Sequence, residues 1–210
     1  MPSLKADHLV YVTSNVDATT DELEKRFGIR PAGGGAHVGR GTRNTLLALG
    51  NEIYLEVLGP DRNQEIQQPA SRFPKQSLLR TWAVKAPQIE KSVRTARSLN
   101  YDPGDVDTMS RKRPDGVQLE WRLTSGGGGG LGTKGIVGFI PFLIDWGTTE
   151  HPSSSAPRGC ELVSLRAEHP DPSSIARNLC AINVELVIEV GDSPALIATI
   201  LTPKGTVELR

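Results

Sequence analysis

Two side chains of this sequence stand where a metal site would need them. His8 lies in a short run of strand-forming residues, and Glu56 lies in a later strand candidate. Because side chains alternate between the two faces of a strand, both can point to one face, and a curled sheet would bring them together on its concave side. An imidazole nitrogen and a carboxylate oxygen suit a divalent ion such as Zn, Mn, Fe or Ni better than Ca or Mg.

Each of these two residues also has a purely structural explanation. A histidine at the start of a strand is often a surface or hydrogen-bonded residue, and a glutamate on a half-exposed strand is often solvated. Glu56, however, stands between Leu55 and Val57 in an otherwise apolar strand. A carboxylate requires a partner if that strand is buried on both faces, which strengthens the case for a site.

Two further residues join Glu56 as candidates for catalysis. His37 lies in a glycine-rich stretch where backbone amides can approach a bound group closely. It is either an acid/base or ligand-anchoring residue or a histidine that hydrogen-bonds its own loop. Arg122, beside Trp121, can clamp a substrate carboxylate with its guanidinium fork, or it is an exposed strand residue. His169 is expected in a turn and outside the site.

The elements that must position these residues follow a repeated order. Residues 6–60 predict β-α-β-β-β, with a helix capped near Thr20 and Asp21 and ended by Gly28. The strand candidates of this first copy are 7–12, 36–40, 44–49 and 53–58. The same order occurs again from Leu79, where Pro87 opens the helix. The strand candidates of this second copy are 80–85, 106–112, 117–123 and 136–146.

A third, shorter round of elements follows. Its predicted helix is 173–179, and its strand candidates are 161–165, 184–190 and 196–201, with 207–209 as a further strand. The expected organisation is therefore a module at 1–61, a second module at 79–147 and a C-terminal βαββ extension at 159–210, packed as one compact unit.

Two connections between these elements are rich in loop-forming residues. Residues 62–75 contain several Gln and Pro, and residues 126–130 are five consecutive glycines, which cannot hold a regular strand. The glycine run is interpreted as a surface connector, with a flap over a pocket as the sharper alternative.

The composition limits the classes of function. Lys and Arg together number 24, as do Asp and Glu, so no surplus charge favours nucleic acid or a membrane surface. The N-terminus lacks the apolar stretch of a signal peptide, and no later run approaches the roughly 18 residues of a membrane span. Cys160 and Cys180 fit neither a disulfide framework nor a zinc motif. We therefore expect a cytoplasmic protein whose partner is a small molecule; the sequence leaves open whether it forms a homodimer.

Three runs of the first module resemble a known family. They are Asp-His-Leu-Val-Tyr at 7–11, the glycine-rich stretch at 33–47 and Tyr-Leu-Glu-Val at 54–57. Together they resemble the opening module of the glyoxalase-like domain family, within the vicinal-oxygen-chelate (glyoxalase, bleomycin resistance and dioxygenase) superfamily. The resemblance implies an α+β fold in which paired βαβββ modules form curved mixed sheets around a cavity. It also assigns His8 and Glu56 as metal ligands, because the first and last strands of each module supply the ligands in that superfamily.

The second copy resembles the family less completely. The similarity lies in 116–123 and 139–147, followed by His151. Its first strand has Thr81 and no usual ligand, where metal-dependent members have His or Gln, so Asp145 and His151 are the remaining ligand candidates. The ligand set is incomplete in this copy, and a metal-free pocket stays an alternative.

The resemblance implies two classes of function. The first is a divalent-metal-dependent enzyme whose ion binds two vicinal oxygens of a small, oxygen-rich substrate, which fits isomerase, lyase and dioxygenase chemistry. The second is a metal-free binding or drug-sequestering protein with the three tryptophans as stacking walls. The fold alone cannot separate them, because function resides in the site.

Overall fold

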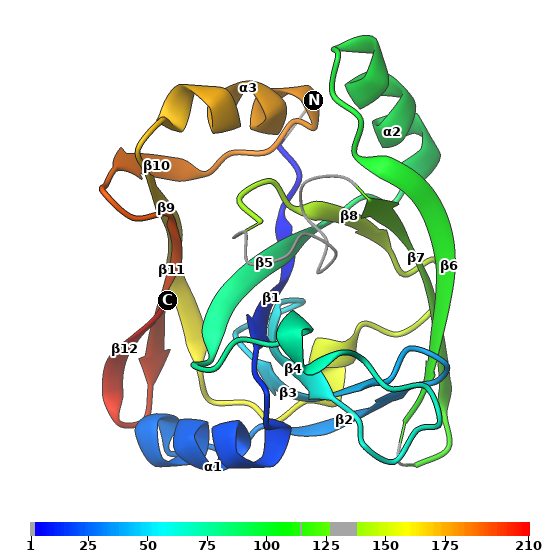
Figure 1. Cartoon of the computed structure of the whole chain (residues 1–210), viewed down its shortest axis with the longest axis vertical. Helices are drawn as coiled ribbons and strands as arrows, with labels where there is room; N and C mark the ends of the chain where they lie inside the picture. Colours follow the sequence, from blue (N-terminus) through cyan, green and yellow to red (C-terminus); the bar gives the residue numbers. More distant parts are fainter. Residues whose placement is uncertain (1–2, 114, 127–137) are drawn as a thin grey trace.

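The described residues form two β-sheets with helices packed against them. Figure 1 shows the computed structural model of the chain, which describes residues 3–113, 115–126 and 138–210. Its α+β architecture, with paired βαβββ modules in a curled sheet, is the one predicted. No helix in these ranges is both long and apolar enough to cross a lipid bilayer.

The first module consists of one helix and four strands. Its elements are β1 (Ala6–Val12), α1 (Val16–Phe27), β2 (Ala32–His37), β3 (Thr42–Ala48) and β4 (Tyr54–Pro60). Helix α1 begins more than one turn earlier than predicted, because Asn15 caps it by accepting a hydrogen bond from the backbone N–H of Ala18. Strand β2 ends at His37 and not at residue 40, because Gly39 and Gly41 have positive φ and turn the chain into β3.

The second module repeats this order. Its elements are β5 (Leu78–Lys85), α2 (Ile89–Ser98), β6 (Gly104–Lys112), β7 (Gln118–Gly126) and β8 (Phe142–Asp145), and a 3-10 turn, η1 (Ala70–Arg72), precedes it. Strand β8 occupies only the second half of the predicted strand 136–146. The glycines at 127–130, predicted to form a connector or a flap, lie outside the described residues.

The two modules share one eight-stranded sheet. The strand order is β2-β3-β4-β1-β5-β8-β7-β6, with β1 parallel to β4 and β5 parallel to β8. The modules meet where β1 pairs antiparallel with β5. The sheet curls so far that its two edge strands, β2 and β6, contact each other. The concave face therefore forms a deep hollow between the strands.

The C-terminal round forms a second, smaller sheet. A 3-10 turn, η2 (Pro152–Ser154), leads to β9 (Glu161–His169), α3 (Pro172–Ala181), β10 (Val187–Val190), β11 (Ala195–Thr202) and β12 (Gly205–Leu209). The residues at 207–209 thus belong to a full strand. The order along the chain is again βαβββ, but the sheet order is β10-β9-β11-β12, so the pairing differs from that of the two modules. In Figure 1 this sheet lies beside β5, which contacts β11.

The hydrophobic core and the cavity lie on opposite faces of the large sheet. In β1, Leu9 and Tyr11 belong to the main core, whereas His8 and Val10 line the cavity. The core continues into the small sheet through side chains such as Leu196, which is fully buried. Because β1 is covered on both faces, its polar residues must find partners inside the protein.

Candidate active site

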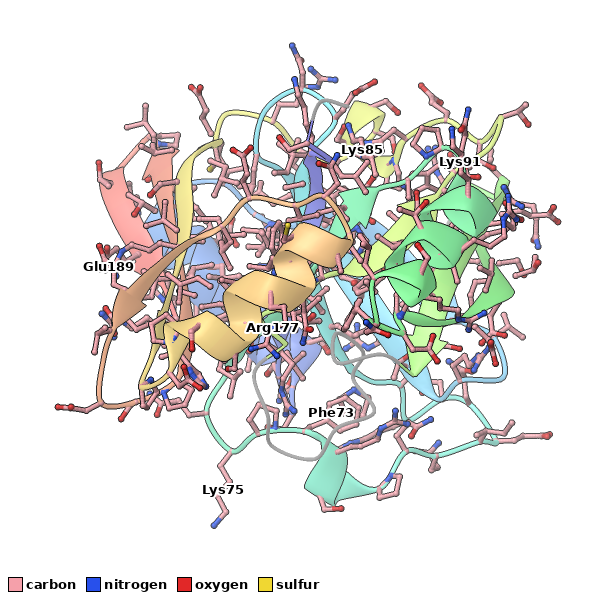
Figure 2. All side chains as sticks on the ribbon, turned by 90° about the horizontal axis from the view of Figure 1, so that it is seen from above. Phe73, Lys75, Lys85, Lys91, Arg177 and Glu189 are labelled. Carbon is pink, nitrogen blue, oxygen red and sulfur yellow. The ribbon has the colours of Figure 1, made fainter. Side chains whose placement is uncertain are left out.

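The concave face of the large sheet encloses a cavity of about 360 Å³, within the size range of small-molecule sites. The segment after β4 closes part of it with Phe73. Figure 2 shows Phe73 turned toward the body of the protein, whereas Lys75, two residues later, projects outward. The deep polar side chains among the described lining residues are His8, His37, Asn44, Glu56, Thr81 and Arg111.

His8 is held by its neighbour Asp7, which is completely buried. The distance from His8 Nδ1 to Asp7 Oδ1 is 2.7 Å. Adjacent residues of a regular strand point to opposite faces, but a register shift in the β1–β5 pairing lies between Ala6 and His8, and bulges of this kind redirect side chains. With Nδ1 occupied by Asp7, Nε2 is the nitrogen that His8 presents to the cavity.

Asp7 accepts hydrogen bonds from two further donors. Trp146 Nε1 lies 3.1 Å from Asp7 Oδ2, and His151 Nε2 lies 3.1 Å from the same oxygen. The backbone N–H of Ser153 donates to His151 Nδ1 at 3.3 Å, so this ring carries its proton on Nε2 and donates to Asp7. Burial would raise the pKa of Asp7, but the hydrogen bonds and charges of His151 and His8 hold it well below its usual range.

An ionised Asp7 determines the tautomer of His8. Because the carboxylate can only accept, the proton of neutral His8 sits on Nδ1, and Nε2 carries the lone pair. The His8 ring stacks on Tyr54, with ring centres 4.7 Å apart. Burial, followed by the charges of Asp7 and Glu56, raises the pKa of Tyr54 well above its ordinary value, so its hydroxyl stays protonated.

Glu56 lies next to His8 on the cavity wall. Their closest atoms, Glu56 Oε2 and His8 Nε2, are 3.8 Å apart, which exceeds a hydrogen bond but lets one substrate atom contact both. The neighbours Leu55 and Val57 point into the core on the other face, so the strand is buried on both sides. The partner that this burial requires is Asn44, whose Nδ2 donates to Glu56 Oε1.

Asn44 and His37 are neighbours whose hydrogen bonds orient both side chains. The backbone N–H of Gly35 donates to Asn44 Oδ1 at 3.0 Å, which orients the amide with Nδ2 toward Glu56. The same Nδ2 lies 3.4 Å from His37 Nε2, and His37 Nδ1 lies 3.0 Å from the hydroxyl of Thr42. Burial lowers the pKa of His37 while the charge of Glu56 opposes this. His37 is therefore a neutral ring whose lone pair already accepts from Asn44, and it positions the amide.

Three of the predicted residues are not brought into the cavity. Asp145 pairs with Arg122 on the opposite face of the sheet, because the side chains that β8 directs into the cavity are Phe142 and Ile144. Arg122 also pairs with Glu90, so it is not positioned as a carboxylate clamp.

His151 does not line the described part of the cavity, and it is linked to the site through its hydrogen bond to Asp7. Of the three tryptophans, Trp121 and Trp146 line the cavity, whereas Trp82 packs in the main core and donates to the Phe139 carbonyl at 2.9 Å.

These positions test whether the residues fit a divalent metal ion. His8 and Glu56 are on the cavity wall, but Asp145 and His151 of the predicted ligand set are engaged elsewhere. The described residues contain no group of three or more His, Cys, Asp or Glu side chains arranged to hold a metal ion. The second module contributes Thr81 and apolar side chains to the wall. This donor set does not fit a transition-metal ion, which usually takes at least three protein ligands.

Two of the deep polar residues of the cavity are not indicated by any sequence motif. Asn44 lies in the glycine-rich stretch at 33–47, and Arg111 lies in the strand candidate 106–112. Arg111 is buried, and its Nη1 has no hydrogen-bond partner within the described parts of the chain. The signal that identifies it is alternation in β6, where Asp107, Met109 and Arg111 form the inward face.

Comparisons with known proteins identify the fold. A hypothetical protein from Staphylococcus aureus matches with a TM-score of 0.63 and 16% identity, over 98% of this chain and 85% of that one. A mutant of 4-hydroxymandelate synthase from Streptomyces coelicolor matches with a TM-score of 0.53 and 16% identity, over 100% of this chain and 63% of that one. A methylmalonyl-CoA epimerase variant from Streptomyces coelicolor matches with a TM-score of 0.43 and 12% identity, over 70% of this chain and 98% of that one.

The sequence comparisons concern the family. No curated protein matches the sequence. The model of the glyoxalase-like domain matches residues 6–182, which is most of the chain and covers both modules. The paired modules and their shared curled sheet agree with that match, and the chain belongs to the glyoxalase-like domain family.

Proposed function

We propose that the protein is an enzyme that moves a proton on a small, oxygen-bearing substrate, with His8 and Glu56 as the two transferring groups. The observation that carries the proposal is the free Nε2 of His8. It faces Glu56 at 3.8 Å, while Nδ1 is held by the buried carboxylate of Asp7. A base oriented by a carboxylate, beside a second proton-carrying group, is the arrangement that general acid–base catalysis requires.

The proposed chemistry follows from the contacts of His8 and Glu56. His8 Nε2 accepts a proton from a substrate carbon next to a carbonyl group, and the electron pair of the broken C–H bond moves onto the carbonyl oxygen. Asp7 stabilises the resulting imidazolium, because it is ionised and 2.7 Å from Nδ1. Returning the proton to another position completes an isomerisation. Glu56, oriented by Asn44, is the second group able to take or return a proton.

A binding protein is the second candidate, and a specific observation favours it. Much of the wall is apolar, including Val10, Leu58 and Phe142, and the rings of Trp121 and Trp146 lie 5.2 Å apart at the same wall. Such walls bind apolar ligands without any chemistry.

Proton exchange separates the two functions. The protein would be incubated in D2O with a panel of small 2-oxo acids and hydroxyketones, and deuterium at the carbon next to the carbonyl would be followed by NMR. We expect exchange that chelator treatment does not reduce. His8→Gln and Glu56→Gln should each lower it by about 100-fold, in the range of a general acid–base contribution. His169→Gln is the control, because that ring accepts from the Asp171 backbone outside the cavity.

The other outcomes are equally informative. Exchange that appears only after Mn, Zn or Ni is added would restore the metal-dependent enzyme. Saturable binding of panel members without exchange by the wild type would leave the binding protein as the better account.

A further inference from the structure

We propose that the ligand of this cavity is a small organic carboxylate with an apolar body, whose anionic group binds the guanidinium of Arg111. The inference rests on the proposed function, because it names the substrate class of the same site. It depends on the environment of one buried charge, which neither His8 nor Glu56 explains.

Arg111 is a buried cation that reaches the cavity. Its side chain is 3% exposed, and it lines the cavity from β6. Its Nη1 has no hydrogen-bond partner among the residues that the structure describes. A buried charged donor without an acceptor destabilises the folded protein, and buried polar groups without a partner are rare in proteins. A bound anion would supply the missing acceptor.

The two carboxylates on the described part of the cavity wall, Glu56 and Asp107, already accept hydrogen bonds from other side chains. Glu56 influences Arg111 through its charge, but in the described parts of the chain the two form no ion pair, and Glu56 Oε1 accepts from Asn44. Asp107, on the same face of β6, accepts from the hydroxyl of Ser125 at 2.5 Å. The guanidinium stays protonated although burial lowers its pKa.

The arginines of the wall are the candidates for binding an anion, and three of them line the described part of the cavity. The other two arginines are exposed and already donate to neighbours: Arg40 to the sulfur of Met109, and Arg72 to Gln68. The buried fork of Arg111 is therefore the most selective anion site, and a planar carboxylate matches a fork in geometry.

The rest of the ligand would lie against hydrocarbon. Val10, Leu58, Phe142 and Ile144 form apolar parts of the same wall. A strongly hydrated, highly charged molecule would lose its water there without replacement. The combination favours a monocarboxylate with an apolar body over inorganic phosphate.

A matched pair of probes tests the inference. Phenylacetate and phenylacetamide have nearly the same shape and differ in charge, and their binding would be measured by calorimetry and by tryptophan fluorescence. We expect the wild type to bind phenylacetate at least tenfold more tightly, as a charge-assisted hydrogen bond predicts. Arg111→Gln should reduce the ratio to about one, and Arg111→Lys should leave an intermediate ratio, because lysine keeps the charge without the fork.

Arg122→Gln is the matched control. This arginine is already paired with Glu90 and Asp145 and should leave the preference for phenylacetate unchanged. A wild type that binds neither probe, or binds both equally, would overturn the inference, as would a preference that survives Arg111→Gln. Inorganic phosphate and phenylphosphonate serve as additional probes, and tighter binding of either than of phenylacetate would contradict the carboxylate assignment.

Two measurements distinguish failure of this inference from other failures. Thermal unfolding of Arg111→Gln should occur at or above the wild-type temperature, because the substitution removes an unsatisfied charge; a lower temperature would indicate a structural arginine. Glu56→Gln should retain the preference for phenylacetate even though its proton exchange is about 100-fold slower. Loss of the preference in that variant would show that Glu56, and not Arg111, determines carboxylate binding.

Discussion

Asp7 is the residue that decides what His8 can do. Three side chains donate to its carboxylate, from His8, His151 and Trp146. Asp7 is not exposed to water, so these three donors replace the hydration of its carboxylate and keep it ionised. The consequence is that neutral His8 carries its proton on Nδ1 and directs the lone pair of Nε2 to the cavity. His151, a predicted metal ligand, contributes by donating to Asp7.

The pKa of His37 measures the field inside the cavity. Burial lowers it, the charge of Glu56 raises it, and the charge of Arg111 lowers it. Glu56→Gln removes a negative charge that favours the imidazolium, so the pKa should fall further. Arg111→Gln removes an opposing positive charge, so the pKa should rise. Titration of the His37 ring by NMR in the wild type and both variants checks these opposite signs.

A control accompanies this titration. Arg122→Gln removes a guanidinium on the other face of the sheet and should leave the His37 pKa unchanged. Shifts of the same sign in the Glu56 and Arg111 variants would mean that rearrangement of the cavity, and not its charges, determines the pKa.

At the scale of the elements, strand alternation explains which parts of the site were predictable. Leu55 and Val57 enter the core and Glu56 the cavity, so a carboxylate in an apolar strand correctly indicated burial on both faces. The same pattern was ambiguous in β8, where Phe142 to Ile144 are all apolar. Either face of this strand could therefore have pointed into the cavity. In the structure Phe142 and Ile144 do so, and Asp145 lies on the opposite face.

Contacts between strands that are distant along the chain could not be predicted from the sequence. Arg111 reaches the cavity because β6 curls round to contact β2, and pairing of this kind depends on the whole sheet. Asn44 acquires its role only when β3 lies beside β4 and β2. The repeated βαβββ order was readable from local patterns, whereas the different pairing of the third round was not, because the order of elements does not specify the order of strands.

The glycine-rich strand β2 gives a prediction at this scale. A Cβ on Gly34 would lie 1.9 Å from the backbone oxygen of Asn44, so the close approach of β2 to β3 requires glycine there. Gly34→Ala should destabilise the protein by about 3 kcal/mol, at the upper end of overpacking costs. Urea denaturation measures this. Gly39→Asn is the control, because its turn has open space and asparagine tolerates positive φ. Equal stability of Gly34→Ala and wild type would argue against the close approach.

At the scale of the whole molecule, the large sheet separates stability from function. Its convex face packs against the helices and the small sheet, and its concave face carries the charged groups of the cavity. Buried polar groups are costly, so the well-packed convex face must offset their effect on the free energy of folding. The C-terminal round therefore supports the site without lining it in the described part of the chain.

This shared core predicts cooperative unfolding. Leu196 of β11 is fully buried in the same cluster as Leu9 of β1, although the two belong to different sheets. Leu196→Ala should lower the free energy of unfolding by about 2–5 kcal/mol. Leu201→Ala, on the same strand but 48% exposed, should change it by less than about 0.5 kcal/mol. Urea unfolding would be followed by circular dichroism for both sheets and by tryptophan fluorescence for the large sheet, because all three tryptophans lie in it or directly beside it. Because one core serves both sheets, the two signals should shift together in Leu196→Ala. A fluorescence transition that keeps its wild-type midpoint while the dichroism transition moves would show that the small sheet unfolds on its own.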